Sequence, residues 1–491
     1  MVLVGERPLS VGDVVRVARY REVVALASTA AARVCRAWEL AQATARRGST
    51  IYGLTTGVGA LRDRSIADAE QAEFNRRLLR SHQVATGPSA SEEIARAALL
   101  CWLSQLSTGF APVRPLLLDR LVEALNGGPL PSLRLRGSIG ASDLGPNADL
   151  AAALYAGVAL EPGEGLILLN HSAPTVGLAS LGVWDARRLI LASELALAAS
   201  LEAFRANLSP YHRSVARSRP SPSLDRTLDR LHALLAGSVL WDAGNARMLQ
   251  DPLSFRSGLH LAAAAREALD RAHQVVDRWL NSYQGNPVAL VDDGLVLSCS
   301  NFESADLSAA LDYLRLALVP LLQSSAERVA KLLNERWSGL PTGLMARSGL
   351  PESGLSIAEI AAHALATEAR LLAYPVSLEA VSGSLAEGIE DRGSFALLGA
   401  RRLREMIELG WDILAIEAVT AHRALAQRGV TRVGEGVAAL LAELDRVLPV
   451  DIWNYPLAEL FACARAVLEA HCSDSAAEAD QFARETEGID E

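Results

Sequence analysis

Apolar residues recur at steps of three and four over much of the chain, which is the spacing of one face of a helix. We expect Ser223 to be an N-cap. After it, the spacing is that of one helix face at four apolar positions, Leu224, Leu228, Leu231 and Leu235. The same pattern predicts further helices, several of them longer than an average globular helix, at residues 189–207, 259–280, 306–334, 357–373, 395–425 and 434–447.

These long helices are so apolar that we expect a bundle whose members are buried on more than one side. Two stretches without charge, residues 97–113 and 165–184, are interrupted by polar residues and proline, so we interpret them as buried core and not as membrane spans. We predict an N-terminal region at 1–190 with two functional loops, and long central and C-terminal helices at 191–491, within one integrated, mainly α protomer. The acidic end, 478–491, is expected to fray.

Composition narrows the class of protein. Among 491 residues, 50% are hydrophobic and 21% are charged, which excludes disordered and low-complexity chains. The net charge of -10 argues against a general nucleic-acid binder. Five scattered cysteines without C-x-x-C spacing indicate reduced thiols, and no signal peptide is recognisable at the start. We therefore expect a cytoplasmic protein with no membrane or nucleic-acid partner and no metal site.

Two glycine-rich segments are candidates for chemistry. The run RGSIGASDLGPNADL at 136–150 is a tight backbone of small residues, and its simplest interpretation is a loop before a helix that begins near Asn147 or Asp149. The run IYGLTTGVGAL at 51–61 lacks the spacing of a phosphate loop. Tyr52 could act as a general base if its surroundings lower its pKa, or it could be an ordinary half-buried loop tyrosine.

Together with further segments, these runs resemble the aromatic amino acid ammonia-lyases and aminomutases, the group of histidine, phenylalanine and tyrosine ammonia-lyases. The resemblance spans residues 52–394. It implies that Tyr52 in YGLTTGVG removes the substrate β-proton. It also gives roles to the last residues of NRRLLRSH, EGLILLN and QDPLSFR. His82 would contact the substrate side chain, Asn170 would be an active-site amide, and Arg256 would clamp the substrate carboxylate. Gln250, the first residue of QDPLSFR, is also expected to bind substrate.

Later motifs continue the resemblance in the same order. NSYQGNP at 281–287, SNF at 300–302 and SGLP at 338–341 resemble family motifs. They imply substrate contacts at Asn301 and Phe302, and Glu390 takes the place of a family glutamate. The resemblance implies a mainly α fold in which long central helices form a tetrameric bundle, with small-molecule active sites built from several subunits.

Each of these residues also has a purely structural interpretation. Arg256 could be a surface arginine, Asn170 could cap a turn, and His82 could be a partly buried histidine with its hydrogen bonds satisfied. Phe302 would pack in the core in either case.

The largest departure from the family lies in its electrophile. The family makes a methylidene-imidazolone from Ala-Ser-Gly, whereas this chain reads Ala141-Ser142-Asp143, with one residue deleted and the glycine lost. Ring closure needs the third nitrogen to attack the first carbonyl, and the Asp143 Cβ opposes that fold. We expect no prosthetic group. Cyclisation stays open because the serine and both backbone groups are present.

Other departures surround the same site. Leu253 replaces a family tyrosine, Asp149 replaces a histidine, and His171 and Ser172 replace small or neutral residues. We expect the altered positions Leu253, His171, Asp149 and Glu303 to face the pocket and to make its substrate different from phenylalanine, tyrosine or histidine.

These changes leave three hypotheses. The first is a ring-free lyase in which Tyr52 transfers a proton in elimination, amine addition, cyclisation or isomerisation on an activated carboxylate or carbonyl substrate. The second is a conventional ammonia-lyase or aminomutase whose triad cyclises. The third is a non-catalytic scaffold, which predicts that Tyr52 and Arg256 do not converge on a pocket.

Overall fold

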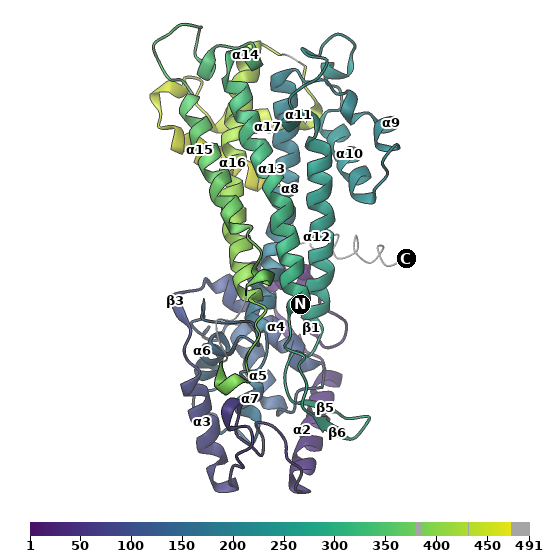
Figure 1. Ribbon diagram of the computed structural model, residues 1–491, viewed down its shortest axis with the longest axis vertical. Helices are drawn as coiled ribbons and strands as arrows, with labels where there is room; N and C mark the ends of the chain where they lie inside the picture. The colour runs from purple at the N-terminus through teal and green to yellow at the C-terminus, as the bar shows by residue number, and fades with distance from the viewer. Residues whose placement is uncertain (380–384, 431, 473–491) are drawn as a thin grey trace.

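Long helices run side by side along the long axis of the molecule in the computed structural model (Figure 1), which describes residues 1–379, 385–430 and 432–472. Among them α8 packs against α12 and α16, and α13 packs against α12, α15 and α16. The bundle therefore has one shared interior. Its members are α8 (Ala173–Phe204), α12 (Gly258–Leu280), α13 (Ala305–Leu333), α15 (Ser356–Leu372) and α16 (Ala396–Arg428).

Shorter elements form a base at the lower end of the bundle in Figure 1. Its strands make small two-stranded sheets: β1 pairs with β2 in parallel, β3 with β4 and β5 with β6 antiparallel. The elements are β1 (Val2–Val4), α1 (Val11–Arg19), β2 (Val24–Leu26), α2 (Ser28–Arg46), α3 (Gln71–Ser81), β3 (Thr86–Ser89), α4 (Glu92–Ser107), α5 (Pro115–Leu125), β4 (Arg134–Arg136), α6 (Leu144–Leu154), α7 (Glu164–Ile167), β5 (Val288–Leu290) and β6 (Leu295–Leu297).

Further helices surround the upper half of the bundle. Figure 1 shows α11 and α14 near its top, beside the ends of α8 and α13. These helices are α9 (Arg213–Ala216), α10 (Pro222–Leu234), α11 (Leu253–Arg256), α14 (Glu335–Ser338), α17 (Glu435–Val447) and α18 (Leu457–His471).

The predicted helices are present, with two corrections at their starts. The helix predicted at 189–207 begins at Ala173, because α8 is buried on nearly every side and has no polar face to mark its first turns. Near residue 222, Ser221 is the N-cap and Pro222 opens α10, so the Ser223 assignment was wrong. The predicted boundary at residue 190 falls inside α8, so the two regions share one continuous helix. Residues 478–491 lie outside the described residues.

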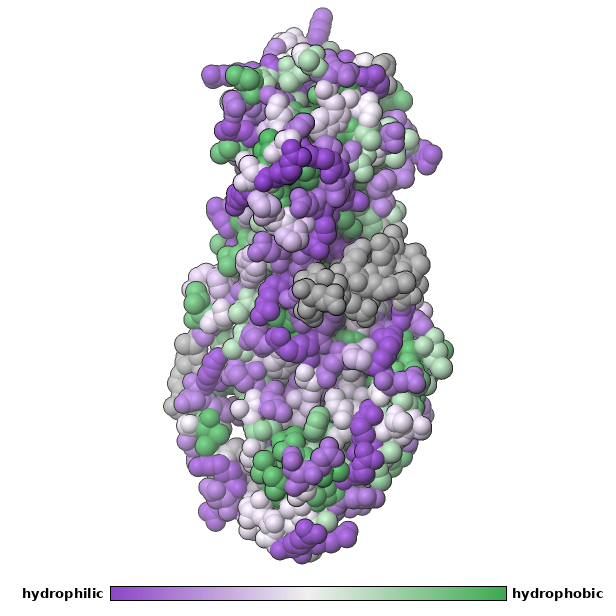
Figure 2. Space-filling model, turned by 90° about the vertical axis from the view of Figure 1, so that its right-hand side faces the viewer, coloured by the Kyte–Doolittle hydropathy of each residue, from purple (hydrophilic) through white to green (hydrophobic). Residues whose placement is uncertain are grey.

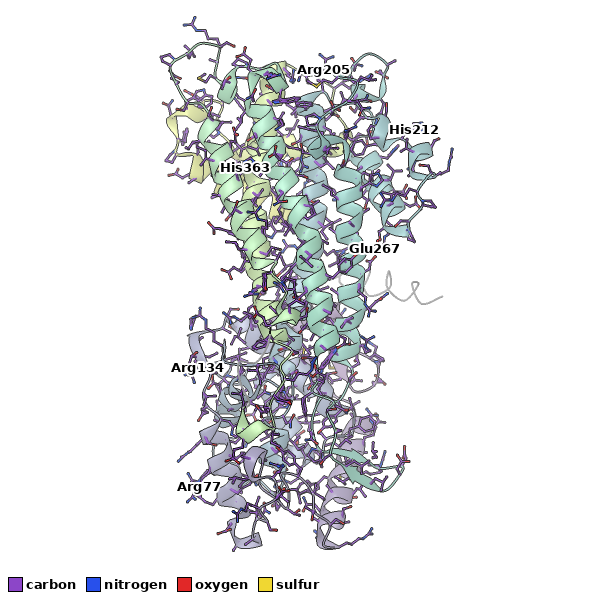
Figure 3. The ribbon with its side chains drawn as sticks, viewed as in Figure 1. Arg77, Arg134, Arg205, His212, Glu267 and His363 are labelled. Carbon is purple, nitrogen blue, oxygen red and sulfur yellow. The ribbon has the colours of Figure 1, made fainter. Side chains whose placement is uncertain are left out.

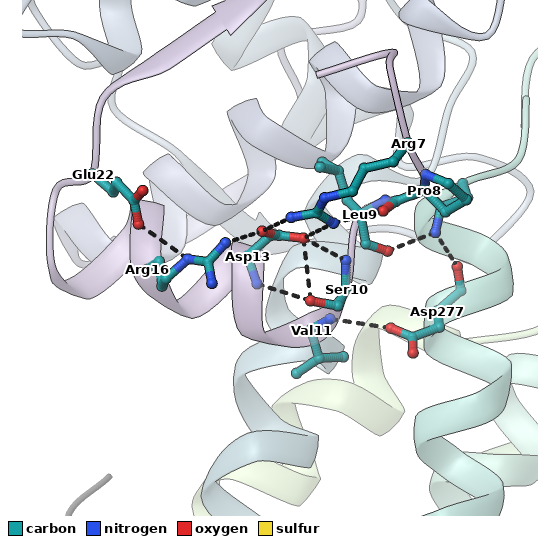
Figure 4. Close-up of polar contacts among 10 residues, drawn as sticks. Arg7, Pro8, Leu9, Ser10, Val11, Asp13, Arg16, Glu22 and Asp277 are labelled. Atoms are coloured by element: carbon teal, nitrogen blue, oxygen red, sulfur yellow. Dashed lines mark hydrogen bonds and ion pairs between the residues drawn. The ribbon is translucent and has the colours of Figure 1, made fainter. Parts of the chain in front are cut away.

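Helix α1 is tied to α12 by a buried polar cluster (Figure 4). The Asp13 carboxylate accepts the Ser10 N–H at 2.9 Å, and the Ser10 hydroxyl accepts the Asp13 N–H at 3.2 Å, which makes a capping box. Arg7 donates two hydrogen bonds of 2.9 Å to the same carboxylate. The Val11 N–H donates to Asp277 on α12 at 3.1 Å. The start of the chain is therefore fixed against the bundle.

A buried ion pair joins three helices in the bundle interior. The Arg328 guanidinium on α13 donates to the Glu417 carboxylate on α16 at 2.5 and 2.8 Å. The Ser200 hydroxyl on α8 donates to the same carboxylate at 2.6 Å. Since a buried charge is tolerated only when paired and hydrogen-bonded, this network fixes how α8, α13 and α16 align.

Hydrophobic side chains also remain on the surface. Figure 2 shows a mostly hydrophilic face with hydrophobic residues gathered in its lower half, on the side of β5 and β6, where Leu295 and Leu297 are exposed. Within the described residues, none of the helices has the length and hydropathy to cross a membrane, and no cluster of His, Cys, Asp or Glu has the makings of a metal site.

Candidate functional site

A cavity of about 570 Å³ lies in the base, beneath the bundle. Loops supply most of its walls: the Tyr52 loop, the start of α6, the segment that follows α7, the chain just before β5 and just after β6, and residues 386–392. Seven residues predicted from the sequence line it together, namely Tyr52, His82, Ala141, Asn170, Phe302, Glu303 and Glu390. Positions far apart in the chain are thus gathered at one place.

The Tyr52 phenol points into this cavity and accepts the Gly59 N–H at 2.9 Å. Burial, the largest effect, raises the pKa of Tyr52 above its usual value; the Gly59 N–H opposes that effect, Glu390 adds to it, and Arg62 opposes it. The sequence analysis made a lowered pKa the condition for Tyr52 to act as a general base, and the surroundings in the single chain do not lower it. Near neutral pH, Tyr52 is a phenol.

Charged residues that the motifs did not mark complete the cavity. Arg62, Asp391 and Arg392 line it, and Arg392 lies 3.3 Å from the carboxylate of Glu303, a residue that the sequence was expected to place in the pocket. Asn286 also lines it. Asn286 belongs to the NSYQGNP motif, so that motif was the signal that could have identified it. The cavity wall thus carries both positively and negatively charged side chains that a substrate could contact.

The Ala141-Ser142-Asp143 segment forms the loop before α6, and Asp143 is the N-cap of that helix. The helix therefore begins at Leu144, earlier than the predicted Asn147 or Asp149. Ser142 has a left-handed backbone, φ 64°, and is buried. Its hydroxyl donates to Asn170 Oδ1 at 2.6 Å.

Asp143 is held at both its backbone and its side chain. Its N–H donates to the His171 carbonyl at 2.9 Å. Its buried carboxylate accepts the Thr175 N–H at 2.9 Å, the Thr175 hydroxyl at 2.7 Å and the Ser138 hydroxyl at 3.0 Å. Burial raises the pKa of Asp143 to about 6, against the opposing effect of these hydrogen bonds.

A methylidene-imidazolone would need the Asp143 nitrogen to attack the Ala141 carbonyl. That nitrogen donates its hydrogen to the His171 carbonyl. The Asp143 carboxylate accepts the Thr175 N–H in the first turn of α8. Ring closure would consume the N–H that donates to His171, and the Cβ of Asp143 opposes the tight turn that the attack needs. The residues present do not fit the group.

Two predicted pocket residues lie elsewhere. His171 is buried and stacks on Trp102, with ring centroids 4.6 Å apart, and burial lowers its pKa to about 3. Asp149 faces Arg134, which donates to it at 2.6 and 2.9 Å. Each side chain is satisfied away from the cavity, so these two pocket predictions were wrong.

Arg256, Gln250 and Leu253 lie at the other end of the molecule. Arg256 ends α11 and donates to Gln250, while Leu253 is 63% exposed. Their segment is tied to the end of α8, near Arg205 at the top of Figure 3, whereas Arg134 lies at the base. Within one chain, the predicted carboxylate clamp and Tyr52 therefore do not converge. Asn301 is exposed and does not line the cavity.

Known proteins that are similar to this chain identify its family. A sequence model described as aromatic amino acid lyase matches residues 9–158 and 155–446. The chain belongs to the aromatic amino acid lyase family. Histidine ammonia-lyase from Sorangium cellulosum is 33% identical, over 94% of this chain and 96% of its own length. The enzyme of the same name from Stigmatella aurantiaca is 33% identical over 90% and 91%.

Solved structures of the aromatic amino acid lyase family share the fold. An ergothioneine-degrading enzyme, ergothionase, from Treponema denticola superposes with a TM-score of 0.90 at 26% identity, over 96% of this chain and 99% of its own. Tyrosine aminomutase from Streptomyces globisporus gives 0.87 at 27% identity, over 96% and 97%. The protein is thus a lyase of the ammonia-lyase family with a mainly α fold, as predicted. The family normally forms a methylidene-imidazolone.

Proposed function

We propose that this protein is a ring-free lyase that eliminates an amine from a small carboxylate substrate, with Tyr52 accepting the proton. The observation that carries the proposal is the attachment of Asp143, whose nitrogen and carboxylate are both hydrogen-bonded away from the Ala141 carbonyl. A cavity lined by Tyr52, His82 and Asn170 supports catalysis on a small substrate.

Without the methylidene-imidazolone as electrophile, the enzyme can act only on certain substrates. A tyrosine phenolate is too weak a base to remove an unactivated β-proton while an ordinary amino group leaves. The substrate must therefore supply activation of its own. The structural similarity to an ergothioneine-degrading enzyme suggests how, because the α-nitrogen of ergothioneine is a trimethylammonium and its ring stabilises negative charge at the β-carbon.

The proposed step balances without any oxidant or co-reactant. The Tyr52 phenolate takes the β-proton and becomes a phenol, and the C–H electrons form the C=C bond. The C–N electrons leave with the nitrogen as a neutral trialkylamine. The other product is an α,β-unsaturated carboxylate. A quaternary nitrogen stays cationic at every pH, so it can leave as a neutral amine without first being protonated.

The carboxylate clamp requires a second copy of the chain. We propose that Arg256 reaches the cavity of a neighbouring subunit in a homotetramer. Exposed apolar side chains along the bundle support this assembly, because large apolar surfaces mark interfaces; on α13 and α15 they include Leu316, Ile357 and Ile360, which is 64% exposed.

The test combines peptide mass with substrate turnover. The peptide spanning residues 137–150 is expected at its unmodified mass, and ergothioneine or histidine trimethylbetaine is expected to release trimethylamine together with an ultraviolet-absorbing acrylate. A peptide lighter by two waters, with ammonia released from histidine, would overturn the proposal.

That second outcome corresponds to a conventional histidine ammonia-lyase, which the relatives favour. The two histidine ammonia-lyases named above match 94% and 90% of the chain. The same experiment therefore decides between the two functions.

A further inference from the structure

Ser142 and Asn170 make a buried hydrogen bond at the wall of the cavity. The Ser142 hydroxyl donates to Asn170 Oδ1 at 2.6 Å, and Asn170 Nδ2 lies 3.5 Å from the carbonyl oxygen of Asn286, to which it donates. Ser142 is 3% and Asn170 8% exposed. The Asn286 carbonyl can only accept, so it requires Nδ2 on its side, and the Ser142 hydroxyl then donates to Oδ1.

The backbone on both sides of this contact is already fixed. The Asp143 N–H is bonded to the His171 carbonyl. Asn147 Nδ2 donates to the Leu169 and His171 carbonyls, each at 2.7 Å. With the main chain held at 169 and 171, the remaining freedom of Asn170 is the rotation of its side chain. Ser142 is the hydroxyl that restricts this rotation.

We propose that Ser142 keeps its hydroxyl and serves as a positioning residue for Asn170. In the arrangement it enforces, one Nδ2 hydrogen is directed at Asn286 and the other is left for a substrate oxygen in the cavity that Asn170 lines. The role rests on the proposed ring-free function, since a serine consumed by cyclisation has no hydroxyl. The hydroxyl that the family loses as water when it forms its electrophile here orients a hydrogen-bond donor.

The physical advantage is preorganisation. An amide fixed before substrate arrives stabilises charge on a substrate oxygen without reorganising during the reaction. Without Ser142, Asn170 Oδ1 is left unpaired in a buried site, and the amide can turn its oxygen toward the substrate. The ligand group recognised is an anionic oxygen, such as a carboxylate.

A double-mutant cycle tests this role with ergothioneine as the probe. Ser142→Ala is expected to lower kcat/KM by about tenfold to a hundredfold, and Asn170→Ala by at least as much. If Ser142 acts through Asn170, the double variant is no worse than Asn170→Ala alone. The matched control is Ser180→Ala, a buried serine on α8 bonded to the Val176 carbonyl, which should leave turnover unchanged.

The outcomes separate this inference from the proposed function. Multiplying losses in the double variant, with an unmodified peptide mass, would overturn the positioning role and leave the ring-free lyase standing. A peptide lighter by two waters would overturn both.

If ergothioneine is not turned over, crystal structures of the wild type and Ser142→Ala decide the question. The expected result is an intact Ser142 hydroxyl on Asn170 Oδ1 in the wild type and a turned amide in the variant. An Asn170 that keeps its orientation without Ser142 would overturn the inference.

Discussion

Tyr52 combines a position suited to catalysis with an environment that keeps it protonated. Its phenol lines the cavity, yet burial and the nearby Glu390 raise its pKa, and the Gly59 N–H and Arg62 only partly offset them. Tyr52 must lose its phenol proton before it can act as a base, so little of the reactive phenolate is present at neutral pH. Catalysis by Tyr52 should therefore depend steeply on pH.

We expect kcat/KM for trimethylamine release to rise about tenfold per pH unit on the way to the raised pKa of Tyr52. Tyr52→Phe should lower the rate by on the order of a hundredfold to ten-thousandfold and remove this pH dependence. Steady-state rates from neutral to alkaline pH measure both effects. A Tyr52→Phe enzyme with the wild-type pH profile would show that another group is the base.

His171 contributes to stability through its neutral form. Burial lowers its pKa to about 3, below the unfolded value of 6.5, so between these values the unfolded chain binds a proton that the folded chain does not. Stability should therefore fall as pH decreases from 6.5. Going to pH 5, the wild type should lose up to about 2 kcal/mol more than His171→Phe. Urea unfolding of both at pH 7 and pH 5 measures the difference; equal losses would contradict the expectation.

Among the elements, α1 shows how a short helix becomes a fixed part of the base. Its first turn is closed by the Ser10–Asp13 capping box, and its start is bonded to α12 through Asp277. Burial acts to raise the pKa of Asp13, but the hydrogen bonds from Arg7 and the Ser10 N–H, with the charges of Arg7 and Arg16, hold that pKa below its usual value. The ionised carboxylate is therefore the stabilising form.

Replacing Asp13 with Asn should lower the free energy of unfolding by about 2 kcal/mol at neutral pH, because a buried carboxylate loses its charge-assisted partners. Since the folded pKa is depressed, the contribution is present above pH 3.8, the usual value, and disappears as pH falls through the folded pKa. Denaturant titrations at neutral and acidic pH test this. The control is Asp229→Asn, which breaks an exposed pair with Arg213 and should change stability by less than about 1 kcal/mol.

The loop before α6 shows the same principle elsewhere in the base. Asp143 caps α6 through its backbone, and its carboxylate accepts the Thr175 N–H in the first turn of α8. An acidic group at a helix N-terminus satisfies a donor that the helix itself cannot. One residue thus joins the loop, α6 and α8.

At the scale of the whole molecule, the residues predicted to be functional are divided between two ends. Tyr52, His82 and Asn170 line the cavity in the base, whereas Arg256 lies on α11 near the top of the bundle (Figure 1). A composite site in an assembly would reconcile the two locations. Each active site would then need at least two chains.

This arrangement predicts complementation between inactive variants. Tyr52→Phe and Arg256→Ala, each expected to be nearly inactive alone, should regain part of the wild-type turnover when co-expressed, because some mixed sites receive Tyr52 from one chain and Arg256 from the other. The measurement is turnover of the purified mixed oligomer. Control oligomers that contain one variant only should stay inactive, and a lack of recovery in properly mixed oligomers would contradict a shared site.

The sequence by itself determined the helices and much of the cavity. Helix periodicity depends on local spacing, so the ranges near 259–280 and 357–373 agree closely with α12 and α15. Ordered motifs identified Tyr52, His82, Asn170, Phe302 and Glu390, all of which line one cavity. The loss of the glycine was also visible in the sequence, because a deletion is read from the order of the residues alone.

Only the tertiary structure decided what surrounds each group. Whether His171 faces a substrate or stacks on Trp102, and whether Asp149 lines the cavity or pairs with Arg134, depends on segments distant in sequence. The direction of the Tyr52 pKa shift and the attachment of Asp143 to Thr175 depend on burial and long-range hydrogen bonds. These are properties of a residue's neighbours, and the folded chain, not local spacing, chooses those neighbours.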